Sequence, residues 1–428
     1  MKKILLLAGL VFAFSACATD RDYHDHDHDH HHGHDGHGHD HHGHDHHDHH
    51  HDHQHGMADG RLLVATADGT LWLFDAHDGD EIAHFDNVLS EGSIAVYGNF
   101  TGELGYAINR NTHQVAIIHS GQKLEEHDGH EDLVFIDPSV LGIFTEGLRP
   151  THFNTTLGRS AIYNDQSGNL TIFDETTLMS QGIAASASFA GAEVDHGAMV
   201  LLHDRMLVGY LNQARVDVMD YEGNVSQVIE NAPRLHGQAR IGRHSIFGLS
   251  TGVMVIEQRG SNFEATTIPN PAGSPENARV GTVYGHPVRD FFVGNFGQGL
   301  ALIDPVAKTF TPFDLPTMPW RFGFDRSGEY IVVLGRDGIL YALEIEDDGD
   351  LHIHSQVQVV EPHNPDAPAG SAIPVLVLGS KIAYVSNPAA RTILEVHLHD
   401  GDIEAEFVVP AAASITGMVL LVTDGIVH

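Results

Sequence analysis

The sequence predicts an all-β protein, a β-propeller of eight blades that follows a histidine-rich N-terminal segment. Short runs rich in Val, Ile, Leu, Phe and Tyr are interrupted by Gly, Asp and Asn roughly every six to ten residues, and no long stretch has a helical period. This pattern recurs at a roughly constant spacing, and the two ends of the chain complement each other. Seven blades are the alternative to eight.

The recurring unit consists of three or four strands in about 40 to 50 residues, which is the size of one propeller blade. In two of the copies a histidine precedes an isoleucine by ten residues, His152 before Ile162 and His236 before Ile246. The clearest copies begin at His152, His196, His236 and Arg321, and less regular copies begin near Ser93, Val280 and Ser371.

The ends of the chain predict how the ring closes. Residues 415–422 have the pattern of an innermost strand with no strand after it, while residues 61–66, 71–75 and 81–85 have the pattern of second to fourth strands with none before them. The termini would therefore share one blade, which removes exposed strand edges. We assign residues 57–428 to the propeller.

The first 18 residues have the layout of a bacterial secretory signal peptide. Lys2 and Lys3 precede an apolar run from Ile4 to Phe14, and small residues follow it. Cys17 is the only cysteine, and it is either the lipidated residue of a lipoprotein signal or part of an ordinary cleavage site. No later segment approaches the roughly 20 apolar residues of a membrane-spanning helix, so we expect an exported protein that is free or lipid-anchored.

Residues 19–56 form a histidine- and aspartate-rich tail. His24 to His55 contains 19 of the 37 histidines and no lysine or arginine. Imidazole binds zinc, copper and nickel, and alternation such as His24, His26, His28 and His30 offers many overlapping sets of donors. Because His24 to His55 contains no apolar residue to bury, this tail is expected to be disordered until metal binds. A purification tag or a neutral spacer is the alternative.

Charge and cysteine content narrow the range of partners and sites. The formal net charge is −36, and residues 57–428 account for −29 of it. Such a charge disfavours nucleic acid and anionic membranes and favours cations. Since the propeller contains no cysteine, a metal site there must use His, Asp and Glu.

Three histidines occupy the same position in successive repeats. His152, His196 and His236 each open an innermost strand, so a propeller would bring them together at one end of its central channel. Three converging imidazoles suit zinc, with an acid or water as the fourth ligand. Glu193 and Asp195 are candidates to orient an imidazole. Taken singly, each histidine is better interpreted as a packed or capping residue, and the metal site is favoured because three share the same position.

A second candidate lies in the longest insertion, where Glu125 and Glu126 precede His127, His130 and Glu131. If residues 124–126 belong to a fourth strand, the cluster lies in the loop that leads to the same end of the central channel as the three histidines. His127 and His130 are then further candidate ligands, and Glu131 a supporting acid. A solvated acidic loop is the alternative. We expect the remaining histidines of outer strands and late loops to lie on the surface: His113, His119, His352, His354, His397 and His399.

Motifs of catalysis are largely missing from the sequence. It contains no Gly-x-Ser-x-Gly, no His-Glu-x-x-His and no phosphate-binding loop, and Gly294 to Gly299 lies between two strands, not between a strand and a helix. We therefore do not expect an enzyme.

The export signal, the His/Asp tail, the cysteine-free propeller and the aligned histidines together resemble the AztD family of periplasmic zinc chaperones. The resemblance implies a carrier that holds Zn(II) on the propeller and passes it to the solute-binding protein of a zinc ABC importer. We expect the protein to be a monomer. It implies that the carriers are among His127, His130, His152, His196 and His236.

Two other functions remain open from the sequence. The first is a metal-dependent propeller hydrolase or lactonase with Glu193 or Glu131 as general base. The second is a storage or detoxification protein with no delivery partner. Copper and nickel also bind such ligands, so zinc follows from the resemblance. Unperturbed histidines predict that metal binding weakens below about pH 6.

Overall fold

The computed structural model describes residues 60–423, apart from 128, 185–186, 276, 347–348 and 369–370. The signal peptide with Cys17 and the tail with His24, His26, His28 and His30 lie outside the described residues. Within the described part, no helix has the length and apolar character needed to cross a bilayer.

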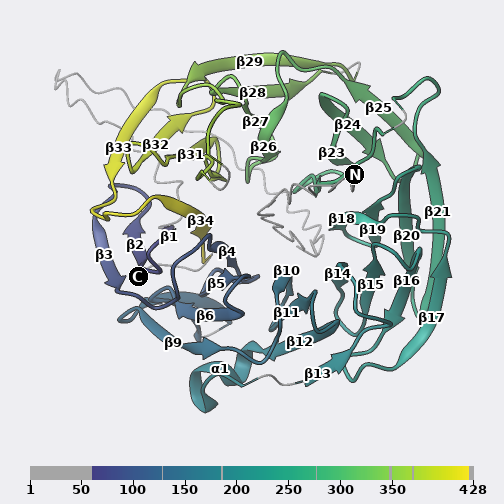
Figure 1. Cartoon of the computed structure of the whole chain (residues 1–428), viewed down its shortest axis with the longest axis horizontal. Helices are drawn as coiled ribbons and strands as arrows, with labels where there is room; N and C mark the ends of the chain where they lie inside the picture. The colour runs from purple at the N-terminus through teal and green to yellow at the C-terminus, as the bar shows by residue number, and fades with distance from the viewer. Residues whose placement is uncertain are drawn as a thin grey trace, which may run out of the picture.

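The chain forms a ring of eight four-stranded antiparallel sheets, so the predicted eight-bladed propeller is confirmed (Figure 1). From the innermost strand outward, blade 1 consists of β34 (Ile415–Leu421), β1 (Arg61–Thr66), β2 (Leu71–Asp75) and β3 (Glu81–Phe85), and blade 2 of β4 (Ala95–Gly98), β5 (Leu104–Asn109), β6 (Gln114–His119) and β9 (Ser139–Phe144). Blade 3 consists of β10 (Pro150–Thr156), β11 (Arg159–Asn164), β12 (Asn169–Asp174) and β13 (Ala187–Ala190), and blade 4 of β14 (Gly197–Leu201), β15 (Met206–Tyr210), β16 (Arg215–Met219) and β17 (Val225–Glu230).

Blades 5 to 8 follow the same order. Blade 5 consists of β18 (His236–Ile241), β19 (His244–Gly248), β20 (Gly252–Arg259) and β21 (Asn262–Pro269), and blade 6 of β22 (Val283–Gly285), β23 (Phe292–Phe296), β24 (Gly299–Asp304) and β25 (Thr309–Phe313). Blade 7 consists of β26 (Pro319–Phe324), β27 (Ile331–Gly335), β28 (Ile339–Ile345) and β29 (Leu351–Gln358), and blade 8 of β30 (Leu376–Leu378), β31 (Ile382–Asn387), β32 (Thr392–His397) and β33 (Ile403–Val408). A short helix, α1 (Glu175–Gln181), connects β12 to β13 and is capped by Asp174.

Blade 1 joins the two ends of the chain as predicted, because β34 pairs with β1 in antiparallel register from Arg61↔Leu421 to Thr66↔Ile415. Alternate residues of β1 then pack on opposite neighbours. Leu62 joins the cluster of blade 8 that contains Tyr384, and Leu63 joins the cluster of blade 2 that contains Ala107. Both leucines are fully buried, so the closing blade is held on both of its sides.

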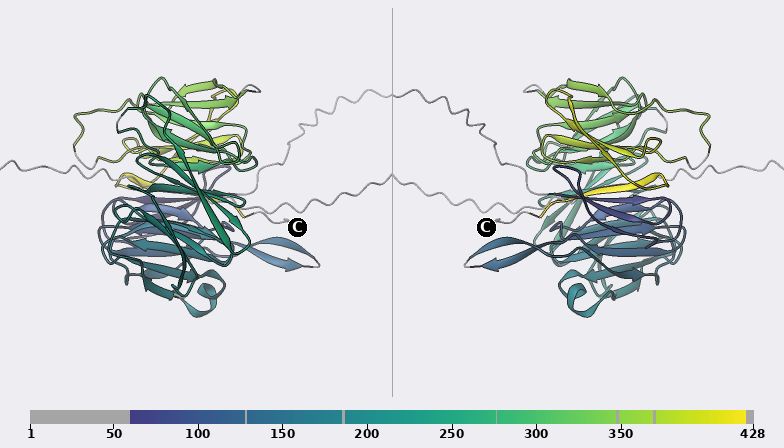
Figure 2. Two further views of the ribbon diagram at one scale, coloured as in Figure 1. Left: turned by 90° about the vertical axis from the view of Figure 1, so that its right-hand side faces the viewer. Right: turned by 90° about the vertical axis from the view of Figure 1, so that its left-hand side faces the viewer.

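The ring has two distinct faces. We call the face where the innermost strands begin the front face and the opposite one, where they end, the back face. Gly60 precedes β1, whose first residue pairs with the last residue of β34, so the described chain starts on the back face. A β-hairpin of β7 (Gln122–His127) and β8 (His130–Phe135), inserted between β6 and β9, projects from this face (Figure 2).

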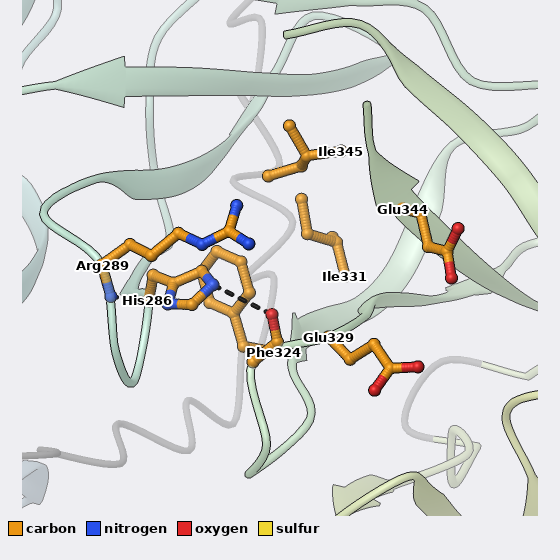
Figure 3. A pocket seen from close by; sticks show the side chains of 8 residues that line it. His286, Arg289, Phe324, Glu329, Ile331, Glu344 and Ile345 are labelled. Atoms are coloured by element: carbon orange, nitrogen blue, oxygen red, sulfur yellow. Dashed lines mark hydrogen bonds between the residues drawn. The ribbon is translucent and has the colours of Figure 1, made fainter. Parts of the chain in front are cut away.

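The back face also carries a pocket between blades 6 and 7. Its walls come from the ends of β22 and β28 and from the turn between β26 and β27 (Figure 3). The residues that line it are His286, Arg289, Phe324, Gly328, Glu329, Ile331, Glu344 and Ile345.

Ring closure can be tested at Ile415, which is fully buried in β34 among residues of blades 1 and 8. We expect Ile415→Ala to lower the free energy of unfolding by about 2–5 kcal/mol, because it leaves a cavity in the closing blade. Val408→Ala is the control, since Val408 is 68% exposed on the outermost strand β33 and should change stability by about 0.5 kcal/mol at most. Equal effects in chemical denaturation would contradict this account.

Candidate metal centre

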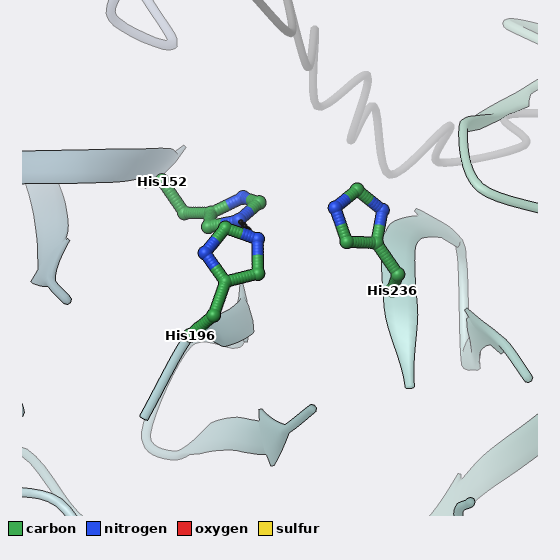
Figure 4. A group of neighbouring side chains, drawn as sticks. All are labelled: His152, His196 and His236. Carbon is green, nitrogen blue, oxygen red and sulfur yellow. Dashed lines mark hydrogen bonds between the residues drawn. The ribbon is translucent and has the colours of Figure 1, made fainter. Parts of the chain in front are cut away.

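Three imidazoles converge at the front face, near the axis of the ring (Figure 4). His152 lies in β10, His196 directly precedes β14, and His236 begins β18, so each comes from the start of an innermost strand in blades 3, 4 and 5. One ring nitrogen from each of the three lies within 4.8 Å of the others. Nε2 of His152 and Nε2 of His196 are 3.0 Å apart. We call these residues the histidine triad.

Local backbone features turn the triad inward. The pairing register shifts between Pro150 and His152 in β10 and between His236 and Gln238 in β18, which marks a β-bulge at each site. In β18 the bulge contains Gly237, whose φ of +76° is unfavourable for other residues and whose added Cβ would lie 2.7 Å from the carbonyl oxygen of Gly281. The glycine therefore allows the bulge that sets the direction of His236.

Hydrogen bonds fix two of the imidazoles. Nδ1 of His196 lies 2.8 Å from Oδ2 of Asp165, and Nδ1 of His236 lies 2.7 Å from the carbonyl oxygen of Gly281. The ionised carboxylate of Asp165 and the carbonyl oxygen of Gly281 can only accept hydrogen bonds. The Nδ1 atoms of His196 and His236 therefore carry the protons, and their Nε2 atoms keep their lone pairs. This is the tautomer that a metal ligand requires.

Asp165 is itself held by an arginine from the neighbouring blade. Arg110 donates to Oδ2 of Asp165 at 2.7 Å and, through Nε, to Thr151 at 2.8 Å. Burial raises the pKa of Asp165, but its bonds to His196 and Arg110 outweigh this and lower the pKa overall. Its other oxygen, Oδ1, is buried without a hydrogen-bond partner. A cation bound at the triad would offset the cost of that buried negative charge.

Burial keeps two members of the triad neutral. It lowers the pKa of His152 well below its usual range, and the neighbouring His196 and His236 lower it further. Burial also lowers the pKa of His236 to about 4, although its bond to Gly281 opposes the shift. A neutral imidazole is the ligating form, so burial favours the state in which His152 and His236 can bind a cation.

Asp195 and Glu193 lie beside the triad in the connection before β14, but neither carboxylate contacts an imidazole in the way that Asp165 does. Asp195 accepts from the backbone N–H of His196 and from Asn212, so it holds the backbone at the start of the strand. Glu193 accepts from the side chain of Gln213.

Residues 124–126 do not form the fourth strand of blade 2, so the condition under which His127 and His130 would lie near the triad is not met. They belong to β7, and the fourth strand of blade 2 is β9. Since this hairpin connects the third strand to the fourth, His130 and Glu131 lie on the back face, away from the triad. His130 contacts Asp132 at 2.9 Å. The backbone of His127 pairs with that of His130, and its side chain is outside the described residues.

Sequence reasoning missed Asp165, Arg110 and Gly281. Asp165 directly follows β11, which pairs with β10, so the topology places it on the front face beside His152. A carboxylate at that position in a histidine-bearing repeat was a usable signal. Of the histidines expected on the surface, His119 is buried at 2% exposure.

Comparison with known proteins finds a relative that matches most of the chain. No family model matches the chain. It is 25% identical to the protein named zinc chaperone AztD from Citrobacter koseri over 345 residues, which cover 78% of this chain and 80% of that protein. The chain resembles AztD. This is the resemblance predicted from the sequence.

Solved structures match in the same way. Two structures of Citrobacter koseri AztD, one of them apo, have TM-scores of 0.77 and 0.75 at 24% identity, covering 87% and 86% of this chain and 100% and 99% of AztD. The dihydro-heme d1 dehydrogenase NirN in complex with DHE has a TM-score of 0.58 at 15% identity, covering 84% of this chain and 75% of NirN. Since these identities are low, the structural matches show a shared fold.

The role of Asp165 can be separated from that of a nearby acid. We expect Asp165→Asn to weaken zinc binding at the triad about 10- to 100-fold, because His196 loses the charged partner that fixes its tautomer. Glu193→Gln is the matched control and should leave the affinity unchanged, since Glu193 bonds to Gln213. Competition titration with a zinc chelator measures both. Equal affinities in the two variants would contradict the role of Asp165.

The pKa values also revise the pH dependence expected from the sequence. Three unperturbed imidazoles would lose roughly a thousandfold in affinity between pH 7.5 and 5.5. Burial lowers the pKa of His152 and of His236 and keeps both imidazoles neutral over this pH range, so the loss should be far smaller than a thousandfold. Zinc titration of a variant that lacks residues 19–56 tests this. A thousandfold loss would show that the triad is not shielded.

Proposed function

We propose that this chain is a periplasmic zinc chaperone that holds Zn(II) at the histidine triad and transfers it to the solute-binding protein of a zinc ABC importer. The observation that carries the proposal is the convergence of His152, His196 and His236 from three blades, with their donor atoms within 4.8 Å. The similarity to AztD supports zinc as the cargo.

The geometry of the triad suits zinc. Neighbouring donors of a tetrahedral zinc with bonds of 2.0–2.1 Å lie about 3.3 Å apart, and the Nε2 atoms of His152 and His196 are 3.0 Å apart. Three protein ligands leave a fourth position for water or for a ligand from a partner. That position is where a receiving protein would bind the ion before the triad releases it.

Exposure favours transfer through the front face. His152 is buried at 4% exposure, whereas His196 has a side chain that is 25% exposed. A partner that approaches this face reaches His196 and His236 before His152. The most buried imidazole would then release the ion last, and hydrated zinc would not form as an intermediate.

The carboxylates near the triad favour a zinc carrier over a zinc-dependent hydrolase. A catalytic zinc works with a nearby general base. Within the described ranges, Asp165 shares one oxygen between His196 and Arg110, and Glu193 bonds to Gln213. Glu131 lies on the back face. The carboxylates that the sequence offered as bases are thus engaged elsewhere or distant.

The His/Asp tail would collect zinc for the triad through many weak sites. Residue 60, the first described residue after the tail, lies on the back face, opposite the triad. The 32 residues from His24 to His55 have a maximum extended length of ~100 Å, which is sufficient for either face to be reached. The protein would act as a monomer in the periplasm, free or tethered through Cys17.

Direct transfer can be measured by comparing two arrangements of the same reactants. Zinc-loaded protein is either mixed with a metal-free zinc solute-binding protein or separated from it by a dialysis membrane. We expect faster transfer on mixing, because the partner supplies ligands while zinc is still bound. His196→Ala should abolish rapid transfer, and His203→Ala, which removes an exposed histidine on the back face, should not.

Equal rates in the two arrangements would contradict a chaperone, because zinc would then pass through free solution. Binding of many equivalent ions without transfer would instead indicate storage. Turnover of a lactone or ester panel by the zinc-loaded protein would indicate an enzyme.

A further inference from the structure

A second group of metal-binding side chains lies on the back face, at the outer edge of blade 7. It contains Glu344, His352 and His354, and one donor atom of each lies within 4.8 Å of the others. We propose that these three residues, which we call the outer cluster, bind a second divalent transition-metal ion of the zinc class. This inference is independent of the function proposed for the triad.

The two outermost strands of blade 7 build the outer cluster. Glu344 lies near the end of β28 and is directly opposite His352 in β29. His352 and His354 are two residues apart, so their side chains leave the strand on the same side. A β-bulge opposite Ala342 and Leu343 gives β29 an extra residue at this point. A His-x-His pair on one strand therefore faces a glutamate on the next.

The donor atoms already have the spacing of a coordination shell. Nε2 of His352 lies 3.4 Å from Oε2 of Glu344, and Nδ1 of His354 lies 3.2 Å from Oε1 of the same carboxylate. Both distances are close to the roughly 3.3 Å between neighbouring donors of a tetrahedral zinc. A metal could thus bind with small movements of these side chains.

Each imidazole has a neighbouring group close to its second ring nitrogen. Nε2 of His354 is 3.1 Å from Nδ1 of His399, which lies in the turn between β32 and β33 of blade 8. That contact leaves Nδ1 of His354 to face Glu344. Nδ1 of His352 is buried and makes no well-directed hydrogen bond, although Oε1 of Glu346 is 3.1 Å away. Outer partners of this kind hold ligands in place in metal sites.

The ligand types select the class of ion. Two imidazoles and one carboxylate suit Zn(II), with Cu(II) and Ni(II) as competitors, whereas Mg(II) and Ca(II) require oxygen donors. Two His and one Glu with an open fourth position is a ligand set that zinc uses in proteins.

The outer cluster is separate from the triad and open to solvent. It shares no residue with the triad and lies on the opposite face. The side chains of Glu344, His352 and His354 are 30%, 41% and 24% exposed, and Glu344 also lines the back-face pocket (Figure 3). A metal ion here would exchange with solvent more readily than one at the triad. Residue 60, the first described residue after the His/Asp tail, lies on the same face as the outer cluster.

The test is zinc protection of individual histidines against diethylpyrocarbonate, read residue by residue by mass spectrometry on the full chain. Added zinc should slow modification of His352 and His354. In Glu344→Gln the zinc concentration for half-protection should rise about tenfold or more, because a charged ligand is lost. His196→Ala should leave protection of the outer cluster unchanged.

His397 is an internal control in the same samples. It lies 3.4 Å from Glu404 in a simple pair on blade 8, and neither residue belongs to a described group of three metal-binding side chains. It should remain reactive. The proposal would be overturned by unprotected His352 and His354 in the unaltered chain, by equal half-protection in Glu344→Gln, by loss of protection in His196→Ala, or by equal protection of His397.

Discussion

Pairing of β34 with β1 holds both ends of the chain in one sheet, and the position of every other blade around the axis depends on that closure. The innermost strands of a closed ring start at equivalent points on the front face. Residues about 40 apart in the sequence, such as His152, His196 and His236, therefore meet. The convergence of the triad is thus a consequence of ring geometry, and a local motif could not build it.

The triad is costly to assemble without a cation. It buries imidazoles close to one another beside a charged carboxylate, and the nitrogens of His152 and His196 are 3.0 Å apart. With the lone pair of His196 directed inward by Asp165, the facing nitrogen of His152 must carry a proton in the metal-free protein to form this hydrogen bond. A metal ion bound at the triad would replace that proton and satisfy the same lone pairs.

The sequence was sufficient for the fold and for the triad, because both follow from the repeat. Equal spacing predicted the blades, and equal position within each repeat predicted that His152, His196 and His236 converge. Asp165 could not be predicted with the same ease, since its role depends on Arg110 from a different blade. The hairpin was misplaced because an inserted pair of strands has the same alternating pattern as a fourth strand. The sequence predicts His352 and His354 as surface residues and does not indicate their cluster, because their partner Glu344 is found only through strand pairing.

Anomalous diffraction at the zinc absorption edge, from crystals of the protein loaded with one equivalent of zinc, tests the central claim most directly. The account predicts a peak at the front face, about 2.0–2.1 Å from a nitrogen of each of His152, His196 and His236. Zinc bound elsewhere while these three imidazoles remain free of it, or a triad whose nitrogens diverge, would contradict the account.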